Sequence, residues 1–260
     1  MIEKLFNSRY TCRTYTDTPV CDDHMNLIIE SAKKAPSKNC IFPYRIAAYT
    51  QSNEGKAAKE HLYRNVCTTN WNIKKDDMLG YDFDRTSIQT PNIKMVQCLR
   101  QIKSPLTLQF IGKFVDDYNP KNLYFDNASN FPSYTISEAM KNGNLETIAR
   151  VIRDITVACS WAQIAAQELG YDTSFVGNGG QHDNALVNQS PYINIEDNET
   201  AILMLCIGKK DIDDVSNTTR CRLEELNIID NTVTEAVFYE RTRPGEKKFR
   251  GNIVPRVDYI

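Results

Sequence analysis

The chain has 260 residues, of which 31 are Lys or Arg and 33 are Asp or Glu, so its formal net charge is −2. This length is enough to bury a substantial core, as one large domain or two small ones. The balanced charge provides no positive field for nucleic acid or for an anionic membrane, so neither partner is expected. The longest apolar run, at 201–207, is too short to span a bilayer, and the first residues show no secretory pattern. We therefore expect a cytoplasmic protein.

The elements predicted along the chain alternate between helices and short strands, which favours an α+β or α/β domain. Asp22 or Asp23 can cap a first helix, and Pro36 marks its end because proline disfavours helical backbone in the residue before it. The next predicted elements are a strand at 44–50, a helix near 54–67 and a strand at 106–111.

The longest predicted helix covers 145–169, where apolar residues recur on a broad face and Gly170 ends the pattern. This periodicity fits either the core of a dimer interface or a buried helix of a monomer. A strand at 171–177 follows, and it leads into Asn178 and Gly179. Glycines after a strand let the backbone approach a flat ligand, although such a run is usually only a turn. A buried strand is expected at 200–208.

Two stretches show no clear period. The stretch 114–143 is interpreted as an insertion or lid over the site, or equally as a solvated loop. The tail at 232–260 mixes basic and apolar residues, and it either wraps a partner subunit or is disordered. The eight cysteines include no Cys-x-x-Cys pair, and the three histidines lie far apart, so no metal site is predicted. Free thiols are favoured over disulfides.

Two arginines near the N-terminus, Arg9 and Arg13, lie four positions apart with Thr11 between them. Forked guanidinium donors and a hydroxyl can bind one dianionic phosphate, although Arg-x-x-x-Arg is also common on solvated surfaces. A second basic pair, Arg220 and Arg222, is by itself typical of a charged loop.

These segments resemble the nitroreductase-like flavoprotein family. Residues 9–15 read Arg-Tyr-Thr-Cys-Arg-Thr-Tyr and are similar to the family's opening motif, Arg-Arg-Ser-x-Arg-x-Phe. Residues 35–44 read Ala-Pro-Ser-Lys-Asn-Cys-Ile-Phe-Pro-Tyr and resemble its second motif, Ala-Pro-Ser-Ser-x-Asn-x-Gln-Pro-Trp. The segments at 154–170, 200–208 and 220–225 resemble the family's central helix, its late core strand and its basic closing pair.

The resemblance implies an α+β fold of the nitroreductase type, with a central, mostly antiparallel sheet flanked by helices and the long helix at a dimer interface. It implies one FMN-binding domain over 1–260 and a homodimer with two sites between the subunits. By the same resemblance, hydride passes from NADH or NADPH to flavin N5 and then, in a ping-pong mechanism, to a small electrophile such as a nitroaromatic, quinone or enone. No side chain is expected to act as acid or base in the hydride steps.

The resemblance also implies roles for individual residues. The phosphate group would be held by residues of the opening motif and the closing pair: Arg9, Thr11, Arg13, Arg220 and Arg222. Tyr10 would be a further cofactor-binding residue. The flavin ring would be supported by Pro36, Ser37 and Cys40, with a further contact from Gln97. The N5 atom would face the backbone of Gly177, Asn178 and Gly179.

Departures from the family pattern keep other functions open. Lys38, Cys40 and Phe42 stand where the family usually has Ser, Asn and Gln, so the cofactor face is expected to be more apolar. One alternative is a relative that oxidises or fragments flavin. Another is an FMN-binding carrier or sensor without turnover.

Overall fold

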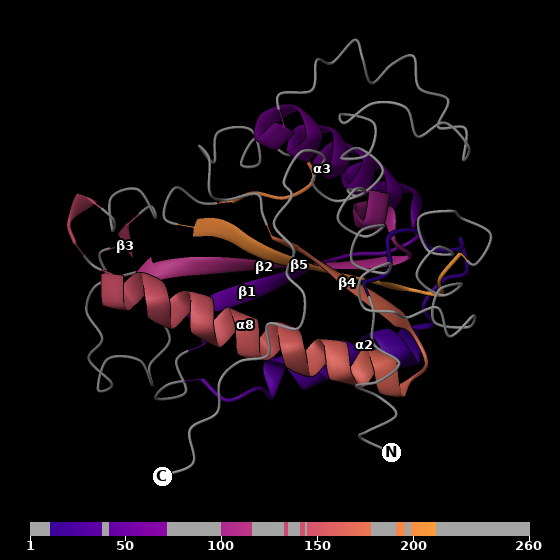
Figure 1. The fold of residues 1–260 in the computed structure, drawn as a ribbon, viewed down its shortest axis with the longest axis horizontal. Coiled ribbons are helices and arrows are strands. Elements are labelled where there is room, and N and C mark those ends of the chain that lie inside the picture. Colours follow the sequence, from indigo (N-terminus) through magenta and orange to yellow (C-terminus); the bar gives the residue numbers. More distant parts are fainter. Residues whose placement is uncertain are drawn as a thin grey trace, which may run out of the picture.

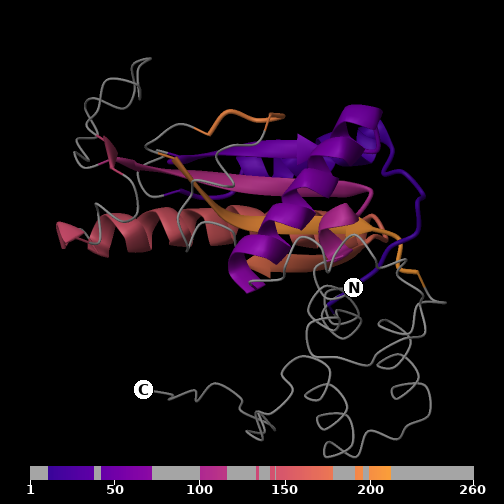
Figure 2. The same ribbon diagram turned by 90° about the horizontal axis from the view of Figure 1, so that it is seen from above.

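An antiparallel sheet lies between two layers of helices in the computed structural model (Figure 1, Figure 2). Helices α2 (Asp22–Lys33) and α8 (Leu145–Glu168) cover one face, while helix α3 (Asn53–Trp71) and the 3-10 helix η2 (Arg100–Lys103) cover the other. The structure describes residues 11–37, 42–71, 100–115, 133–134, 141–143, 145–177, 191–195 and 199–211, with the backbone alone at 64–71, 114–115 and 133–134. The antiparallel sheet and its helical layers confirm the expected α+β fold.

The register of the sheet decides which segments meet at each of its ends. The strand order is β1 (Tyr44–Tyr49), β2 (Leu106–Val115), β5 (Glu199–Gly208) and β4 (Asp172–Gly177), and the short β3 (Ser133–Tyr134) pairs with β2. Tyr44, at the start of β1, pairs with Gly112, which in turn pairs with Thr200 of β5. Gly177, at the end of β4, pairs with Leu203. The start of β1 and the end of β4 therefore lie at the same end of the sheet, on its two opposite edges.

Most elements begin and end close to the predicted residues, and the differences have local reasons. The expected cap at Asp22 or Asp23 is wrong, because Cys21 is the N-cap of α2 and makes no side-chain cap hydrogen bond. The two aspartates occupy the first turn of α2 and Lys33 its last turn, which suits the helix dipole. Helix α3 continues beyond 67 to Trp71 through threonine and asparagine, which have poor helix propensity. Strand β2 runs past its predicted end at 111 to Val115, because its backbone pairs with β5 and β3. The strand β3 and the helix η2 are too short to leave a periodic pattern.

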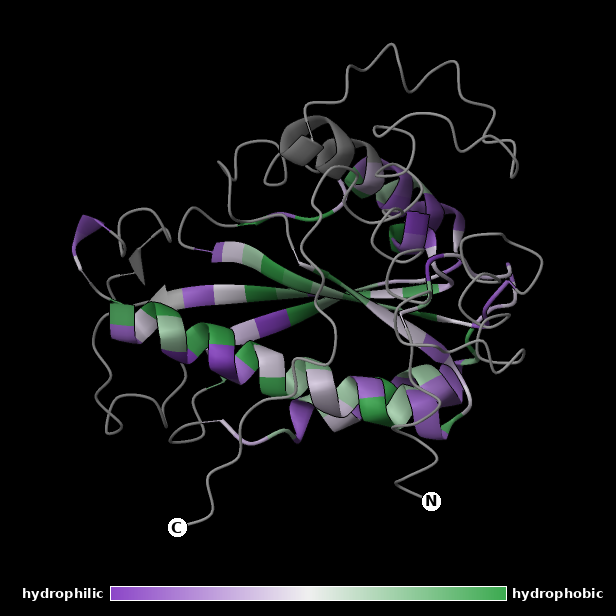
Figure 3. Ribbon diagram, in the orientation of Figure 1, coloured by the Kyte–Doolittle hydropathy of each residue, from purple (hydrophilic) through white to green (hydrophobic). Residues whose placement is uncertain are grey.

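The main core lies between α8 and the sheet. Val151 and Ile155 of α8 are buried beneath β2, and Gly112 of β2 makes room for them. A Cβ at Gly112 would lie 2.7 Å from Cγ1 of Val151, so only glycine fits there without rearrangement. Full burial of a side chain such as Ile155 contributes about 1.5–3 kcal/mol. Figure 3 shows the strands coloured as hydrophobic over much of their length between the helical layers.

The N-terminal segment is hydrogen-bonded to the outer edge of β4 and to the chain just after β5. The amide of Cys12 donates to the carbonyl of Thr173 at 3.1 Å, and the amide of Thr16 donates to the carbonyl of Lys209 at 2.8 Å. The buried hydroxyl of Tyr15 lies 2.8 Å from Oγ of Ser174. This segment is thus tied to the last two strands of the described chain.

Cys12, Cys159 and Cys206 are free thiols buried in the core, and Cys21 is a free thiol at the surface. Within the described ranges, no group of His, Cys, Asp or Glu side chains has the arrangement needed to hold a metal ion. No helix in this part of the chain combines the length and the apolar character needed to cross a membrane.

Candidate functional site

Ser37 fastens the segment after α2 to the middle of α8. Its hydroxyl donates to Oδ2 of Asp154 at 2.7 Å and accepts the amide N–H of Phe42 at 3.0 Å. Asp154 is only 3% exposed, so the bond to its carboxylate is charge-assisted and shielded from water. The other carboxylate oxygen accepts a longer bond, 3.3 Å, from Nε of the largely exposed Arg153. Both ends of the segment 37–42 are therefore held through one hydroxyl.

Phe42 has an unusual backbone at the end of this segment. Its φ is +50°, a left-handed value that is uncommon for a residue with a bulky side chain. Its carbonyl accepts the amide of Tyr44 at 2.7 Å, and the two rings meet edge to face. Phe42 is 40% exposed. An aromatic surface thus stands at the position where the family motif has glutamine.

Tyr44 links this segment to the helices beneath it. Its hydroxyl is directed at the carbonyl of Ala32 at 3.4 Å. Burial, together with the nearby charge of Asp154, raises the pKa of Tyr44 to about 12. The phenol therefore keeps its proton, and with it the ability to donate, over the ordinary pH range.

Gly177 ends β4 at the same end of the sheet as this segment. A Cβ at Gly177 would meet no atom of the described residues within 4 Å, so among these residues the space beside its backbone is open. The two segments lie at opposite edges of the sheet, three strand spacings apart. At about 4.8 Å for each spacing, that is about 14 Å. Backbone next to open space can approach a flat ligand closely, as predicted for this position.

Arg13 lies along the outer edge of β4. Its Nη1 donates to Oε1 of Gln101 at 3.1 Å, and Nε2 of Gln101 is directed at the carbonyl of Phe175 at 3.5 Å. Gln101 lies in η2 and is 3% exposed. Phe175 precedes Gly177 by two residues, which puts the anchor of the guanidinium about 7 Å along the strand from the open backbone. Thr11 is half-buried beside this edge.

The structure therefore places some of the predicted site residues and leaves others as predictions. Pro36, Ser37 and Gly177 lie at one end of the sheet, while Thr11 and Arg13 lie on the outer edge of β4. The other predicted site residues lie outside the described residues: Arg9, Tyr10, Cys40, Gln97, Asn178, Gly179, Arg220 and Arg222. The segments proposed as a lid, at 114–143, and as a C-terminal extension, at 232–260, also lie almost entirely outside them.

Sequence reasoning missed two residues that hold the predicted ones. Asp154 had a usable signal, because an acidic residue interrupts the apolar face of the predicted long helix. Gln101 had none, because it lies in a short 3-10 helix that shows no pattern.

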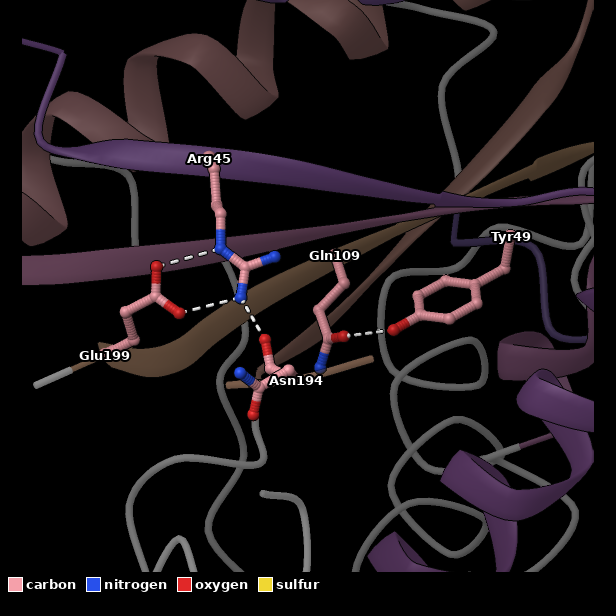
Figure 4. Close-up of polar contacts among 5 residues, drawn as sticks. All are labelled: Arg45, Tyr49, Gln109, Asn194 and Glu199. Atoms are coloured by element: carbon pink, nitrogen blue, oxygen red, sulfur yellow. Dashed lines mark hydrogen bonds and ion pairs between the residues drawn. The ribbon is translucent and has the colours of Figure 1, made fainter. Parts of the chain in front are cut away.

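A second polar cluster lies on the α3 side of the sheet (Figure 4). Arg45 of β1 binds both carboxylate oxygens of Glu199 and donates to the carbonyl of Asn194 at 2.6 Å. Beside it, the hydroxyl of Tyr49 donates to Oε1 of Gln109 at 2.7 Å. The bond from Arg45 to Asn194 holds residues 191–195 against the sheet. None of the bonds of this cluster involves Ser37 or Gly177.

The model of the nitroreductase family matches residues 7–209, most of the chain and all of the strands described above. The chain belongs to the nitroreductase family. The match confirms the resemblance to this family of oxidoreductases.

Solved structures share the nitroreductase fold at low sequence identity. A nitroreductase from Bacteroides fragilis, solved with bound FMN, is 13% identical, has a TM-score of 0.52, and matches over 82% of this chain and 89% of its own. The protein ydfN from Bacillus subtilis is 15% identical, with a TM-score of 0.51 over 82% of this chain and 89% of its own.

A third solved structure, a BluB-like flavoprotein from Clostridium difficile, is 15% identical, with a TM-score of 0.50 over 81% of this chain and 90% of its own. At these identities the likeness shows the fold. A search among curated proteins found no match.

Proposed function

We propose that this member of the nitroreductase family is an FMN-dependent oxidoreductase that takes a hydride from NADH or NADPH and delivers it to a small electrophile, such as a nitroaromatic, quinone or enone. The observation that carries the proposal is the family match over residues 7–209. A cytoplasmic location fits a protein that needs reduced nicotinamide and keeps free thiols.

The chemistry of the placed residues fits a flavin mononucleotide. Arg13 offers guanidinium donors that suit a phosphate group, and Gln101 anchors it beside β4. The open space at Gly177 lets a flat ring approach the backbone. The hydroxyl of Ser37 keeps one lone pair beyond its two bonds to other described residues. The three features are thus a charged group for the phosphate, space for the ring and a polar group beside it.

When bound, FMN supplies the N5 atom that accepts and passes on the hydride. The chain's own residues would hold and orient it. Thr11 and Arg13, with the predicted Arg9, would bind the phosphate, and Pro36 and Ser37 would support the ring. The backbone of Gly177 would lie against the ring, together with the predicted Asn178 and Gly179.

We further propose that the protein is a homodimer with two sites between the subunits. Ser37 and Gly177 lie at opposite edges of one sheet. In a site between two subunits, one flavin ring could contact Ser37 of one chain and the backbone of Gly177 of the other. Trp161 and Ile164 on the outer surface of α8 are each 44% exposed. They are neighbours on the helix, so their apolar surface suits a second copy.

The test is an anaerobic absorbance titration of the FMN-loaded protein with NADH and with NADPH. Bleaching near 450 nm that reverses when a quinone or nitroarene is added would support the oxidoreductase. A bound flavin that neither nucleotide reduces would favour the carrier or the flavin-fragmenting alternative, and flavin consumption would separate the latter. No FMN binding after reconstitution would overturn the proposal.

A further inference from the structure

Asp154 is an acidic residue on the buried face of a helix that otherwise packs apolar side chains against the sheet. Its neighbours on this face include Val151, Ile155 and Ala158, all buried in the core. A buried carboxylate costs free energy unless its oxygens are hydrogen-bonded. Oδ2 of Asp154 is satisfied by the hydroxyl of Ser37, so the two residues belong to one arrangement.

The hydrogen bond from Ser37 restricts what this hydroxyl can do for a ligand. A serine hydroxyl has one proton to donate and two lone pairs that can accept. Its proton is directed at Asp154, and one lone pair receives the amide of Phe42. Among the residues that the structure describes, this leaves a single acceptor available, half-buried at the end of the sheet.

The same hydroxyl also holds the backbone of Phe42. A left-handed φ at a bulky residue is strained, and the bond from its amide to Ser37 helps to stabilise it. If Ser37 turned away from Asp154, the amide of Phe42 would lose this acceptor. The carboxylate therefore acts on Phe42 through Ser37, although no bond joins it to Phe42.

We propose that Asp154 is a positioning residue for the bound flavin, which fixes Ser37 as an acceptor that meets an N–H or O–H donor of the cofactor. The inference rests on the proposed function. FMN carries such donors in the imide of its ring and in its ribityl hydroxyls. A ring carbonyl or a phosphate oxygen has no proton to offer and would not suit this position.

The first experiment uses the protein without flavin. Amide hydrogen exchange at Phe42 is compared among the wild type, Asp154→Asn and Ser37→Ala. An asparagine side chain can donate its own N–H to the serine oxygen, so it releases the serine proton from its fixed direction. We expect exchange at Phe42 to be about tenfold faster in both variants, which corresponds to the loss of one hydrogen bond. Unchanged protection in Ser37→Ala would overturn the inference.

The second experiment measures FMN binding by the quenching of flavin fluorescence. We expect Asp154→Asn and Ser37→Ala each to weaken FMN binding about tenfold. The double variant should bind no more weakly than Ser37→Ala alone, because Asp154 acts through Ser37. Effects that multiply in the double variant, or an unchanged affinity in Asp154→Asn, would overturn the inference.

Glu199→Gln is the matched control. It neutralises another buried carboxylate, on the opposite face of the sheet, and should leave FMN affinity unchanged. If Asp154→Asn does not fold, Ser37→Ala still tests the inference. It removes the bonds of Ser37 to Asp154 and to the Phe42 amide without altering a buried charge. A wild-type protein that binds no FMN would overturn the proposed function and this inference together, whereas normal wild-type binding with insensitive variants overturns the inference alone.

Discussion

The guanidinium of Arg45 crosses strand β2 and donates two hydrogen bonds to the carboxylate of Glu199, of 2.8 Å from Nε and 2.7 Å from Nη2. Glu199 is 6% exposed, whereas the side chain of Arg45 is 40% exposed, so the pair lies half in the core. Two parallel bonds of this kind fix orientation as well as charge. The pair therefore ties an outer strand of the sheet to a strand that it does not touch.

Replacement of Arg45 by methionine should lower the free energy of unfolding by about 1–3 kcal/mol, because a buried carboxylate loses its bidentate partner. Urea denaturation measures this change. The double variant Arg45→Met with Glu199→Gln should regain part of the loss, since no buried charge is left behind. Equal destabilisation by the double and the single variant would contradict this explanation.

Gly112→Ala should destabilise the protein by about 1–3 kcal/mol, because its Cβ would overlap the side chain of Val151. Thermal and urea denaturation give the change. Adding Val151→Ala should reduce the effect of the Gly112 substitution, since the methyl group that clashes is then absent. The matched control is Gly177→Ala, whose Cβ would meet no atom of the described residues within 4 Å and should leave stability within about 0.5 kcal/mol of wild type.

The side chain of Lys59 gives the folding stability a pH dependence. Lys59 is 1% exposed and donates to the carbonyls of Ser104 and Pro105, and burial lowers its pKa to about 8. Between this value and the ordinary lysine pKa of about 10.4, the unfolded chain binds more protons than the folded one. The contribution of Lys59 to stability should therefore rise with pH, by about 1–3 kcal/mol in total.

Urea denaturation at about pH 7.5 and about pH 9.5 tests this, with Lys59→Met as the comparison. The difference in unfolding free energy between wild type and variant should shift in favour of the wild type at the higher pH. Because both proteins contain the same buried tyrosines, the titration of those groups cancels. A difference that does not change with pH would show that Lys59 titrates normally.

Arg13→Gln should weaken FMN binding about tenfold or more, because the guanidinium is proposed to bind the phosphate. Riboflavin has no phosphate, so its binding should be nearly unchanged. Fluorescence titration with both flavins measures the two affinities. Gln101→Leu should reproduce a smaller part of the effect by removing the anchor of the guanidinium. Equal losses for FMN and riboflavin would contradict a role in phosphate binding.

Trp161→Glu or Ile164→Glu should convert the proposed dimer into a monomer, because a charge would then be buried in the apolar contact. Sedimentation velocity or light scattering measures the change in mass. Leu27→Glu is the matched control, since Leu27 is 55% exposed on α2 and should tolerate a charge without a change in mass. A wild-type protein that is already monomeric would contradict the dimer.

The sequence predicted the long elements well and the contacts between distant elements poorly. The apolar periodicity of α8 and the apolar run of β5 set their positions, because each buries a continuous face or strand in the core. The bonds of Asp154 to Ser37 and of Arg13 to Gln101 join residues that are far apart in sequence, and no local pattern records such a pairing. Periodicity reports burial, whereas the partner of a polar side chain depends on the whole fold.

Figure 1 shows that the described chain begins beside strands that come much later in the sequence. The segment around Cys12 and Tyr15 is bonded to Thr173, to Ser174 and to residues 209–211. Contacts over such separations are slow to form, because the loops they close are long. During synthesis on a ribosome, this segment emerges before β4 and β5, so it must wait for them before it has an edge to pair with. Until then its polar backbone groups must bond to water, so this edge is among the last parts of the domain to be completed.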